Sequence, residues 1–202
     1  MDNFYFTNFQ GRSVYYYDGS TGETKVVLSD RPRPNGIEWD EERKVMYVCE
    51  NEAGKVAAYT VNNDHSLTGR RDFATVAGSD GTVIDELGNL YVVSGGVGAY
   101  VFKPDGTKLG EIPIPSVQVT NLAFGGADFM SLYLVANKGI YKLPMKVKGY
   151  KTGMPPVSLL GRSPRKGLGI FRVQPSIYRI DGRHLDWNLK AKQPESFQFL
   201  LP

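Results

Sequence analysis

Hydrophobic and polar positions recur along the first 146 residues with a period near 43. Three stretches share one layout, in which a small polar residue is followed by an apolar run, a polar turn and a hydrophobic-Tyr-hydrophobic segment: "PNGIEWDEERKVMYV", "SDGTVIDELGNLYVV" and "VTNLAFGGADFMSLYL". The polar residues that begin them are Asn35, Asp80 and Asn121. A tyrosine follows each after 12, 11 and 12 positions, namely Tyr47, Tyr91 and Tyr133, and Tyr5 lies 42 residues before the first of these. The chain therefore contains an internal repeat.

Each repeat predicts four short strands. An inner strand follows the polar residue ("GIEW", "GTVID", "LAFG"), and the tyrosine strand comes next ("KVMYVCE", "NLYVVS", "SLYLVA"). A third strand follows in every copy ("KVAAYTV", "GAYVFKP", "GIYKLPM") and a fourth in two of them ("RRDFATV", "KLGEIPIP"). No helical period of apolar residues persists over ten positions in this region. A four-stranded repeat of 40 to 45 residues is typical of a β-propeller blade, so the predicted fold class is all-β.

The sequence opens in the middle of a blade. The segments "NFYFTN", "RSVYYYD" and "ETKVVLS" match the second, third and fourth strands of a repeat, and no first strand precedes Met1. The chain thus predicts a partial β-propeller of about three and a half blades, whereas a closed ring has about four to eight. Three explanations are open: the chain is a fragment of a larger propeller, the tail supplies strands, or two copies complete each other. We favour the fragment.

The repeat disappears near Gly149, which divides the chain into a propeller region, 1–149, and a basic tail containing Pro and Gly, 150–202. The tail includes "KTGMPPVSLLGRSPRKGLGIF", which shows no alternation, and two segments with strand character, "QPSIYRIDGRH" and "SFQFLLP". We expect the tail to be poorly ordered, because it cannot bury enough apolar surface by itself. The alternative is that it covers the open edge of the last blade.

Composition and charge narrow the function classes. The 202 residues are 41% hydrophobic and 22% charged, as in ordinary globular proteins. The net charge of +3 divides into +7 over residues 147–202 and −4 over the rest. A basic tail on an acidic body, without a nucleic-acid-binding motif, argues against nucleic acid as a partner. No run of 18 apolar residues exists, so no membrane span is expected. No secretory signal is visible at Met1, but a chain that opens in mid-blade leaves the compartment unknown, with the cytoplasm only as a forced choice.

The single cysteine is expected to be structural. Cys49 lies in the predicted strand "MYVCE", and one cysteine cannot form an internal disulfide or a cysteine zinc cluster. A buried small hydrophobic residue is the ordinary role of such a cysteine.

The polar residues that begin the repeats are candidates for a binding site. In a propeller the first strand of each blade lines the central channel, so equivalent positions converge at one mouth. Asn35, Asp80 and Asn121 would place a carboxylate and two amide carbonyls there, and hard oxygen donors suit Ca²⁺ better than zinc. The only histidines are His65 and His184, which makes histidine-based metal chemistry improbable. The alternative is that Asn-Gly and Asp-Gly simply form turns. Their shared phase in the repeat favours a site.

These stretches resemble the last half of the gluconolactonase family, which includes regucalcin and the luciferin-regenerating enzymes. The similarity spans residues 3 to 149, and "FYFTNF" resembles the family's "YFTD" strand, with Asn8 where an aspartate is common. The resemblance implies a six-bladed propeller that binds one divalent cation, usually Ca²⁺, in its channel. It also implies a small-molecule lactone or a related ester as the substrate.

The resemblance also assigns roles to individual residues. Asn35 matches a metal-ligand asparagine, and Asp80 matches a ligand aspartate that is also the proposed general base. Asn8 stands where some members have a ligand aspartate, and Asn121 matches a channel position that would contact substrate. The family's ligand glutamate and the substrate-contacting residues of its earlier blades have no counterpart here. The expected function is therefore a metal-dependent lactone hydrolase, impaired and weak in Ca²⁺ binding. The alternative is a non-catalytic propeller fragment, either an interaction module or an inactive truncated product.

Overall fold

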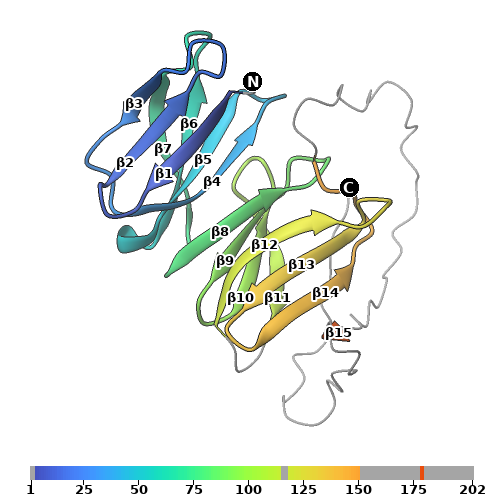
Figure 1. The fold of residues 1–202 in the computed structure, drawn as a ribbon. Helices are drawn as coiled ribbons and strands as arrows, with labels where there is room; N and C mark the ends of the chain where they lie inside the picture. Colours follow the sequence, from blue (N-terminus) through green and yellow to red (C-terminus); the bar gives the residue numbers. More distant parts are fainter. Residues whose placement is uncertain (1–2, 115–117, 151–177, 180–202) are drawn as a thin grey trace.

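The structure, a computed structural model, describes residues 3–114, 118–150 and 178–179 (Figure 1). These residues form strands in four antiparallel sheets, together with one 3₁₀ turn, η1 (Asn51–Ala53). The all-β partial propeller predicted from the sequence is confirmed. Within the described ranges, no helix has the length and apolar character needed to cross a membrane.

The sheets follow one another along the chain. The first has three strands, β1 (Phe4–Asn8), β2 (Ser13–Tyr17) and β3 (Thr24–Leu28). The second has four, β4 (Pro34–Asp40), β5 (Val45–Glu50), β6 (Lys55–Val61) and β7 (Leu67–Thr75). The third also has four, β8 (Ser79–Ile84), β9 (Leu90–Ser94), β10 (Gly98–Phe102) and β11 (Lys108–Pro113). The last contains β12 (Val119–Gly125), β13 (Ser131–Ala136), β14 (Gly139–Pro144) and β15 (Tyr178–Arg179).

The internal repeat corresponds to these sheets. The four repeat tyrosines lie in equivalent strands of separate sheets, β1, β5, β9 and β13, as the 43-residue period predicts. In the first sheet the tyrosine strand β1 stands at the edge, because β2 and β3 continue the sheet in one direction only. Successive inner strands contact one another, with β4 beside β8 and β8 beside β12, and the tyrosine strand β1 also contacts β4. Figure 1 shows the first and last sheets at opposite ends of this series.

The core lies between neighbouring sheets and follows from the two-residue period of strand side chains. On β5, Met46 and Val48 join the cluster between the first and second sheets, whereas Tyr47 and Cys49 join the cluster between the second and third. A third cluster fills the space between the last two sheets. Cys49 is free and fully buried, as predicted, and burial raises the pKa of its thiol to about 12.

Two short segments beyond β14 join this body. The Glu86 N–H donates to the Lys148 carbonyl at 2.8 Å, and the Tyr150 N–H donates to the Ile84 carbonyl at 3.1 Å. Position 149 requires a glycine where the chain passes Phe124 of β12, because a Cβ at this position would lie 2.2 Å from the Cβ of Phe124. Further along, β15 pairs antiparallel with β14 and adds a fourth strand to the last sheet. The strand expected in "SFQFLLP", like the order of the remaining tail, lies outside the described residues.

Candidate functional site

The Asn-Gly and Asp-Gly pairs lie in strands, so the interpretation of these pairs as simple turns is wrong. Asn35 and Asp80 are the second residues of β4 and β8. The glycine that follows each of them allows neighbouring inner strands to approach each other closely. A Cβ on Gly36 would lie 2.1 Å from the Asp80 carbonyl oxygen, and one on Gly81 would lie 2.3 Å from Asn121 Oδ1.

A β-bulge occurs near the same phase in all three inner strands. The strand register shifts between Pro34 and Ile37 in β4, between Ser79 and Thr82 in β8, and between Val119 and Asn121 in β12. Each shift gives the inner strand one more residue than its partner. A bulge re-aims the side chains around it, and bulges are frequent beside functional sites. The polar residues that begin the repeats therefore share a local backbone irregularity as well as a position.

Asn35 and Asp80, which come from two neighbouring sheets, are in direct contact. The Asn35 side chain forms a hydrogen bond with the Asp80 carboxylate. Both residues are half-buried. Burial raises the pKa of Asp80 above its ordinary value, and the hydrogen bond from Asn35 offsets part of that shift. This pair is the one part of the predicted site that the structure brings together side chain to side chain.

Asn121 and Asn8 lie near this region but have other partners. Asn121 is exposed, and its Oδ1 accepts a hydrogen bond from the Leu122 N–H at 2.8 Å. Asn8 is exposed at the end of β1, and its Oδ1 accepts the Gly11 N–H at 2.7 Å across the following turn. Each of the two asparagine side chains therefore accepts a hydrogen bond from a backbone N–H close to it in the sequence.

Two residues not identified from the sequence hold the backbone around the pair. Thr7 Oγ1 donates to the Asn35 carbonyl oxygen at 2.7 Å, which ties β1 to β4. Asn51 Nδ2 donates to the Ser79 carbonyl oxygen at 2.8 Å, directly before Asp80. The sequence carries no motif for either contact, because each joins residues 28 positions apart.

Glu38 is a third residue that the sequence analysis missed. It lies on β4, and its carboxylate accepts a hydrogen bond from the Ile84 N–H of β8. Burial, followed by the negative charge of Asp40, raises the pKa of Glu38 from 4.5 to about 8. The equivalent positions, each paired with a repeat tyrosine, hold Val83 and Ala123. A comparison of the three repeats position by position would have identified this exception.

The chemistry of the Asn35–Asp80 pair suits a hard cation. A carboxylate and an amide carbonyl are oxygen donors of the kind that Ca²⁺ and Mg²⁺ prefer. Across the described part of the chain, His, Cys, Asp and Glu side chains form no cluster of three that could hold a metal ion. The donor types therefore fit a divalent cation, with Asn35 and Asp80 as the residues that would hold it, but this pair supplies a single negative charge.

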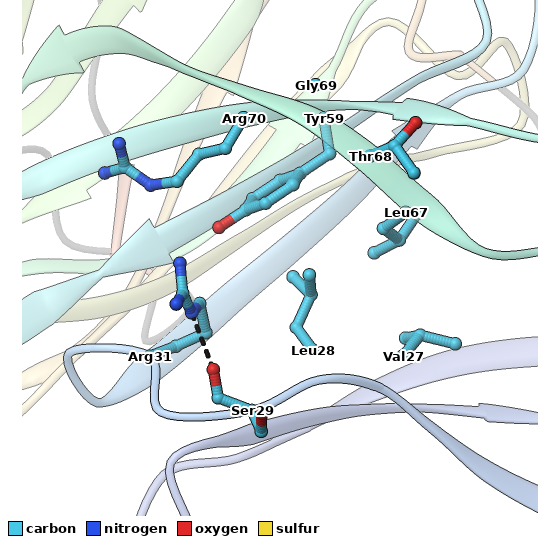
Figure 2. A pocket seen from close by; sticks show the side chains of 9 residues that line it. All are labelled: Val27, Leu28, Ser29, Arg31, Tyr59, Leu67, Thr68, Gly69 and Arg70. Carbon is cyan, nitrogen blue, oxygen red and sulfur yellow. Dashed lines mark hydrogen bonds between the residues drawn. The ribbon is translucent and has the colours of Figure 1, made fainter.

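A cavity of about 370 Å³ lies elsewhere, between the first and second sheets (Figure 2). Its lining comes from β3, the segment after it, β6 and β7, and includes Arg31, Tyr59 and Arg70. These three side chains surround Glu50, which is 1% exposed: Arg70 lies 2.6 Å from its carboxylate, the Tyr59 hydroxyl 3.1 Å and Arg31 3.9 Å. A buried carboxylate needs such partners. The two arginines are therefore accounted for by their structural role as partners of Glu50.

Comparisons with known proteins agree with this fold. Residues 1–138 match the SMP-30/Gluconolactonase/LRE-like region. The pentonolactonase XacC of Haloferax volcanii is 32% identical over 126 residues, covering 59% of this chain and 42% of that protein. Regucalcin of Danio rerio is 27% identical over 146 residues, covering 63% and 50%. A gluconolactonase of Xanthomonas campestris is structurally similar, with a TM-score of 0.59, 29% identity, and coverage of 65% and 44%.

The described sheets define a partial β-propeller, and its inner strands β4 and β8 carry the candidate site. The chain belongs to the SMP-30/gluconolactonase/LRE-like family. It spans about half the length of the curated relatives it matches.

Proposed function

We propose that this chain provides the catalytic carboxylate and part of the metal site of a divalent-cation-dependent lactone hydrolase. The contact between Asn35 and Asp80 is the observation that carries the proposal, because two strands of different repeats bring hard oxygen donors together. The similarity to proteins named pentonolactonase and gluconolactonase supports a lactone as the substrate. Ca²⁺ is the proposed ion, since a protein of this fold is described as a calcium-binding regucalcin.

In the proposed reaction, water adds to the carbonyl carbon of the lactone and the ring carbon–oxygen bond breaks, which yields a hydroxy acid. Asp80 accepts the proton of the attacking water and returns it to the departing ring oxygen. A general base works best when its pKa approaches the working pH, so the raised pKa of Asp80 suits this role. Asn35 holds Asp80 in place. A bound divalent cation would supply charge stabilisation to the developing oxyanion.

The two remaining predicted residues have lesser roles in this proposal. Asn121, exposed beside Gly81, would bind a substrate hydroxyl with its amide nitrogen while its oxygen stays on the Leu122 N–H. Asn8 is a third metal ligand only if its oxygen leaves the Gly11 N–H. With one carboxylate the site should bind Ca²⁺ weakly, with a dissociation constant on the order of 10⁻³ M.

The metal site is tested by calorimetric titration of the 202-residue chain with Ca²⁺, next to two variants. Asp80→Asn removes the negative charge and should abolish the binding heat. Asp105→Asn removes an exposed carboxylate whose oxygen accepts the Thr107 N–H in a distant turn, and should leave binding unchanged. Equal binding by wild type and Asp80→Asn would remove Asp80 from the site.

The activity is tested separately, with gluconolactone as the probe and acid release as the readout. We expect slow or undetectable hydrolysis by the chain alone, because an open channel wall neither orients the substrate nor excludes water. Co-expression with the N-terminal half of a complete lactonase relative should restore hydrolysis, and Asp80→Asn should abolish it again. A complemented protein that folds but does not hydrolyse the lactone would favour the second candidate, a non-catalytic propeller piece.

A further inference from the structure

The cavity of about 370 Å³ between the first and second sheets has a charged end and an apolar end (Figure 2). The guanidinium groups of Arg31 and Arg70 lie at one end together with the Tyr59 hydroxyl. Three aliphatic side chains form the opposite end, namely Val27, Leu28 and Leu67. Small-molecule sites combine apolar walls with a few polar groups in this way, and this cavity has the size of a small one. The lining therefore favours a small ligand with one charged and one apolar end.

The charged end carries more positive than negative charge. Arg70 lies 2.6 Å from Glu50 and 2.9 Å from Asp72. Lys55 forms an ion pair with Asp72, and Arg31 lies 3.9 Å from Glu50. Three cations thus share two carboxylates, which leaves this connected group a net charge of +1, three minus two. Because the described residues that line the cavity include no carboxylate, the charged end favours an anion.

Arg31 retains hydrogen-bond donors beside its role as a partner of Glu50. Its Nε donates to the Ser29 carbonyl oxygen at 2.8 Å, which fixes the plane of the guanidinium (Figure 2). The group also meets the Tyr59 hydroxyl, whereas its distance of 3.9 Å from Glu50 is too long for a hydrogen bond. A guanidinium carries more N–H donors than these contacts use, and a carboxylate can accept a parallel pair of them. The side chain is 28% exposed, so an anion can reach it.

A β-bulge in β7 turns Arg70 towards this cavity. Gly69 and Arg70 together stand opposite Tyr59 alone, and Gly69 has a φ of 63°. Side chains three positions apart on a regular strand point to opposite faces. The extra residue changes this order, so that Arg70 lies on the same face as Leu67 and Tyr59. Bulges of this kind re-aim side chains and are frequent beside binding sites.

The backbone around Arg31 is also unusual. Asp30 has a φ of 55° and Arg33 a φ of 50°, which non-glycine residues seldom adopt. The Arg31 N–H donates to the Arg12 carbonyl oxygen at 2.9 Å and ties this segment to the first sheet. Conformations of this kind persist only where the surrounding structure holds them, and they are concentrated at ligand sites. Both arginines thus reach the cavity from local backbone irregularities.

We propose that this cavity is a binding site for a small aliphatic carboxylate. The carboxylate accepts hydrogen bonds from Arg31, and its hydrocarbon chain lies against Val27, Leu28 and Leu67. Arg70 contributes charge, because its own donors are engaged by Glu50 and Asp72. The site uses neither Asn35 nor Asp80, so it is independent of the proposed lactone hydrolysis.

The test is a titration of the 202-residue chain with hexanoate, followed by the NMR shifts of its backbone amides. A chelator is present throughout, so that no carboxylate binds through a metal at the Asn35–Asp80 pair. Hexanoate should shift the amides of Ser29, Gly69 and Arg70 in a saturable way. Acetate lacks the chain and hexanamide lacks the charge, so each should bind about tenfold more weakly or worse.

Three variants test the residues. Arg31→Gln should weaken hexanoate binding about tenfold or more, because the pair of charged donors is lost. Arg71→Gln is the matched control: it makes the same charge change on the same strand, but Arg71 lies over the Phe73 ring and does not line the cavity, so binding should stay unchanged. Arg31→Lys keeps the charge beside Glu50, which protects the fold, but lacks the planar fork, and should weaken binding about threefold or more.

The absence of any saturable shift at these amides would overturn the proposal. Acetate binding as tightly as hexanoate would do so too, because the apolar end would then contribute nothing. Equal affinities of Arg31→Gln and Arg71→Gln would show a general effect of charge instead of a site. If Arg31→Gln fails to fold, Arg31→Lys decides, and a Lys variant that binds like the wild type would remove Arg31 from the site.

Discussion

The Glu38 carboxyl shows how one residue on an inner strand acquires properties that its repeat counterparts lack. Val83 and Ala123 occupy the same position in the next two sheets and carry no charge. At this position Glu38 is half-buried against β8 with Asp40 as its negative neighbour, and its pKa rises to about 8. The carboxyl is therefore mostly protonated in the folded protein at neutral pH, whereas an unfolded chain would ionise it near its ordinary value of 4.5.

This shift predicts a pH dependence of stability with a defined sign. Because the folded pKa lies above the unfolded one, folding takes up a proton, and the stabilisation is complete below about pH 4.5. It is lost progressively as the pH rises towards 8. Glu38→Gln should remove this loss, so the urea midpoints of variant and wild type should diverge between pH 5 and pH 8. Glu23→Gln, at an exposed side chain, should follow the wild type. Parallel curves for Glu38→Gln and wild type would contradict the buried carboxyl.

At the scale of elements, glycine controls the distance between inner strands. Gly36 lies where β4 passes the Asp80 carbonyl oxygen of β8, and this contact lies beside the Asn35–Asp80 hydrogen bond. The neighbouring atom belongs to the backbone, so no side-chain rotation can relieve a clash there. The glycine in the Asn-Gly pair is thus a packing requirement between two sheets.

Gly36→Ala should therefore destabilise the fold and separate the candidate ligands. The added methyl group would lie 2.1 Å from the Asp80 oxygen, and overpacking of this kind costs about 2 kcal/mol or more. Gly96→Ala is the control, because a Cβ there meets nothing within 4 Å, and its stability should change by less than about 0.5 kcal/mol. Urea denaturation measures both. A Gly36→Ala protein as stable as Gly96→Ala would show that β4 and β8 do not approach so closely.

At the scale of the whole molecule, the sheets stack in series and each contacts its neighbours through a separate hydrophobic cluster. The middle sheets are covered on both faces, and all five residues of β9 are buried. The first sheet is covered on one face, has three strands, and exposes alternate residues of β1. Such an arrangement gives local stabilities that differ from sheet to sheet.

Hydrogen exchange followed by mass spectrometry should reveal these differences in local stability between the sheets. We expect the amides of β5 and β9 to exchange slowest and those of β1 and β3 to exchange faster, since fewer contacts must break to open the first sheet. Uniform protection across the first three sheets would mean that they unfold as one cooperative unit.

The sequence by itself determined the blades. The period of the tyrosines and the alternation of apolar residues are local properties, and they located the strands of the described repeats and the burial of Cys49. They also showed that Asn35, Asp80 and Asn121 occupy equivalent positions in the repeat. The expected inner strands began two or three residues late, because a polar residue followed by glycine, as at Asn35 and Asp80, is typical of a turn as well as of a bulged strand.

Only the tertiary structure decided which of these residues meet. The hydrogen bond between Asn35 and Asp80, the raised pKa of Glu38 and the enclosure of Glu50 by arginines all depend on residues from different parts of the chain. The pairing of β15 with β14 joins segments more than 30 residues apart. These features depend on how closely neighbouring strands and sheets approach and on which charges they bury. A local pattern of side chains fixes the strands, but distances between strands and burial of charge arise only when the whole chain has packed.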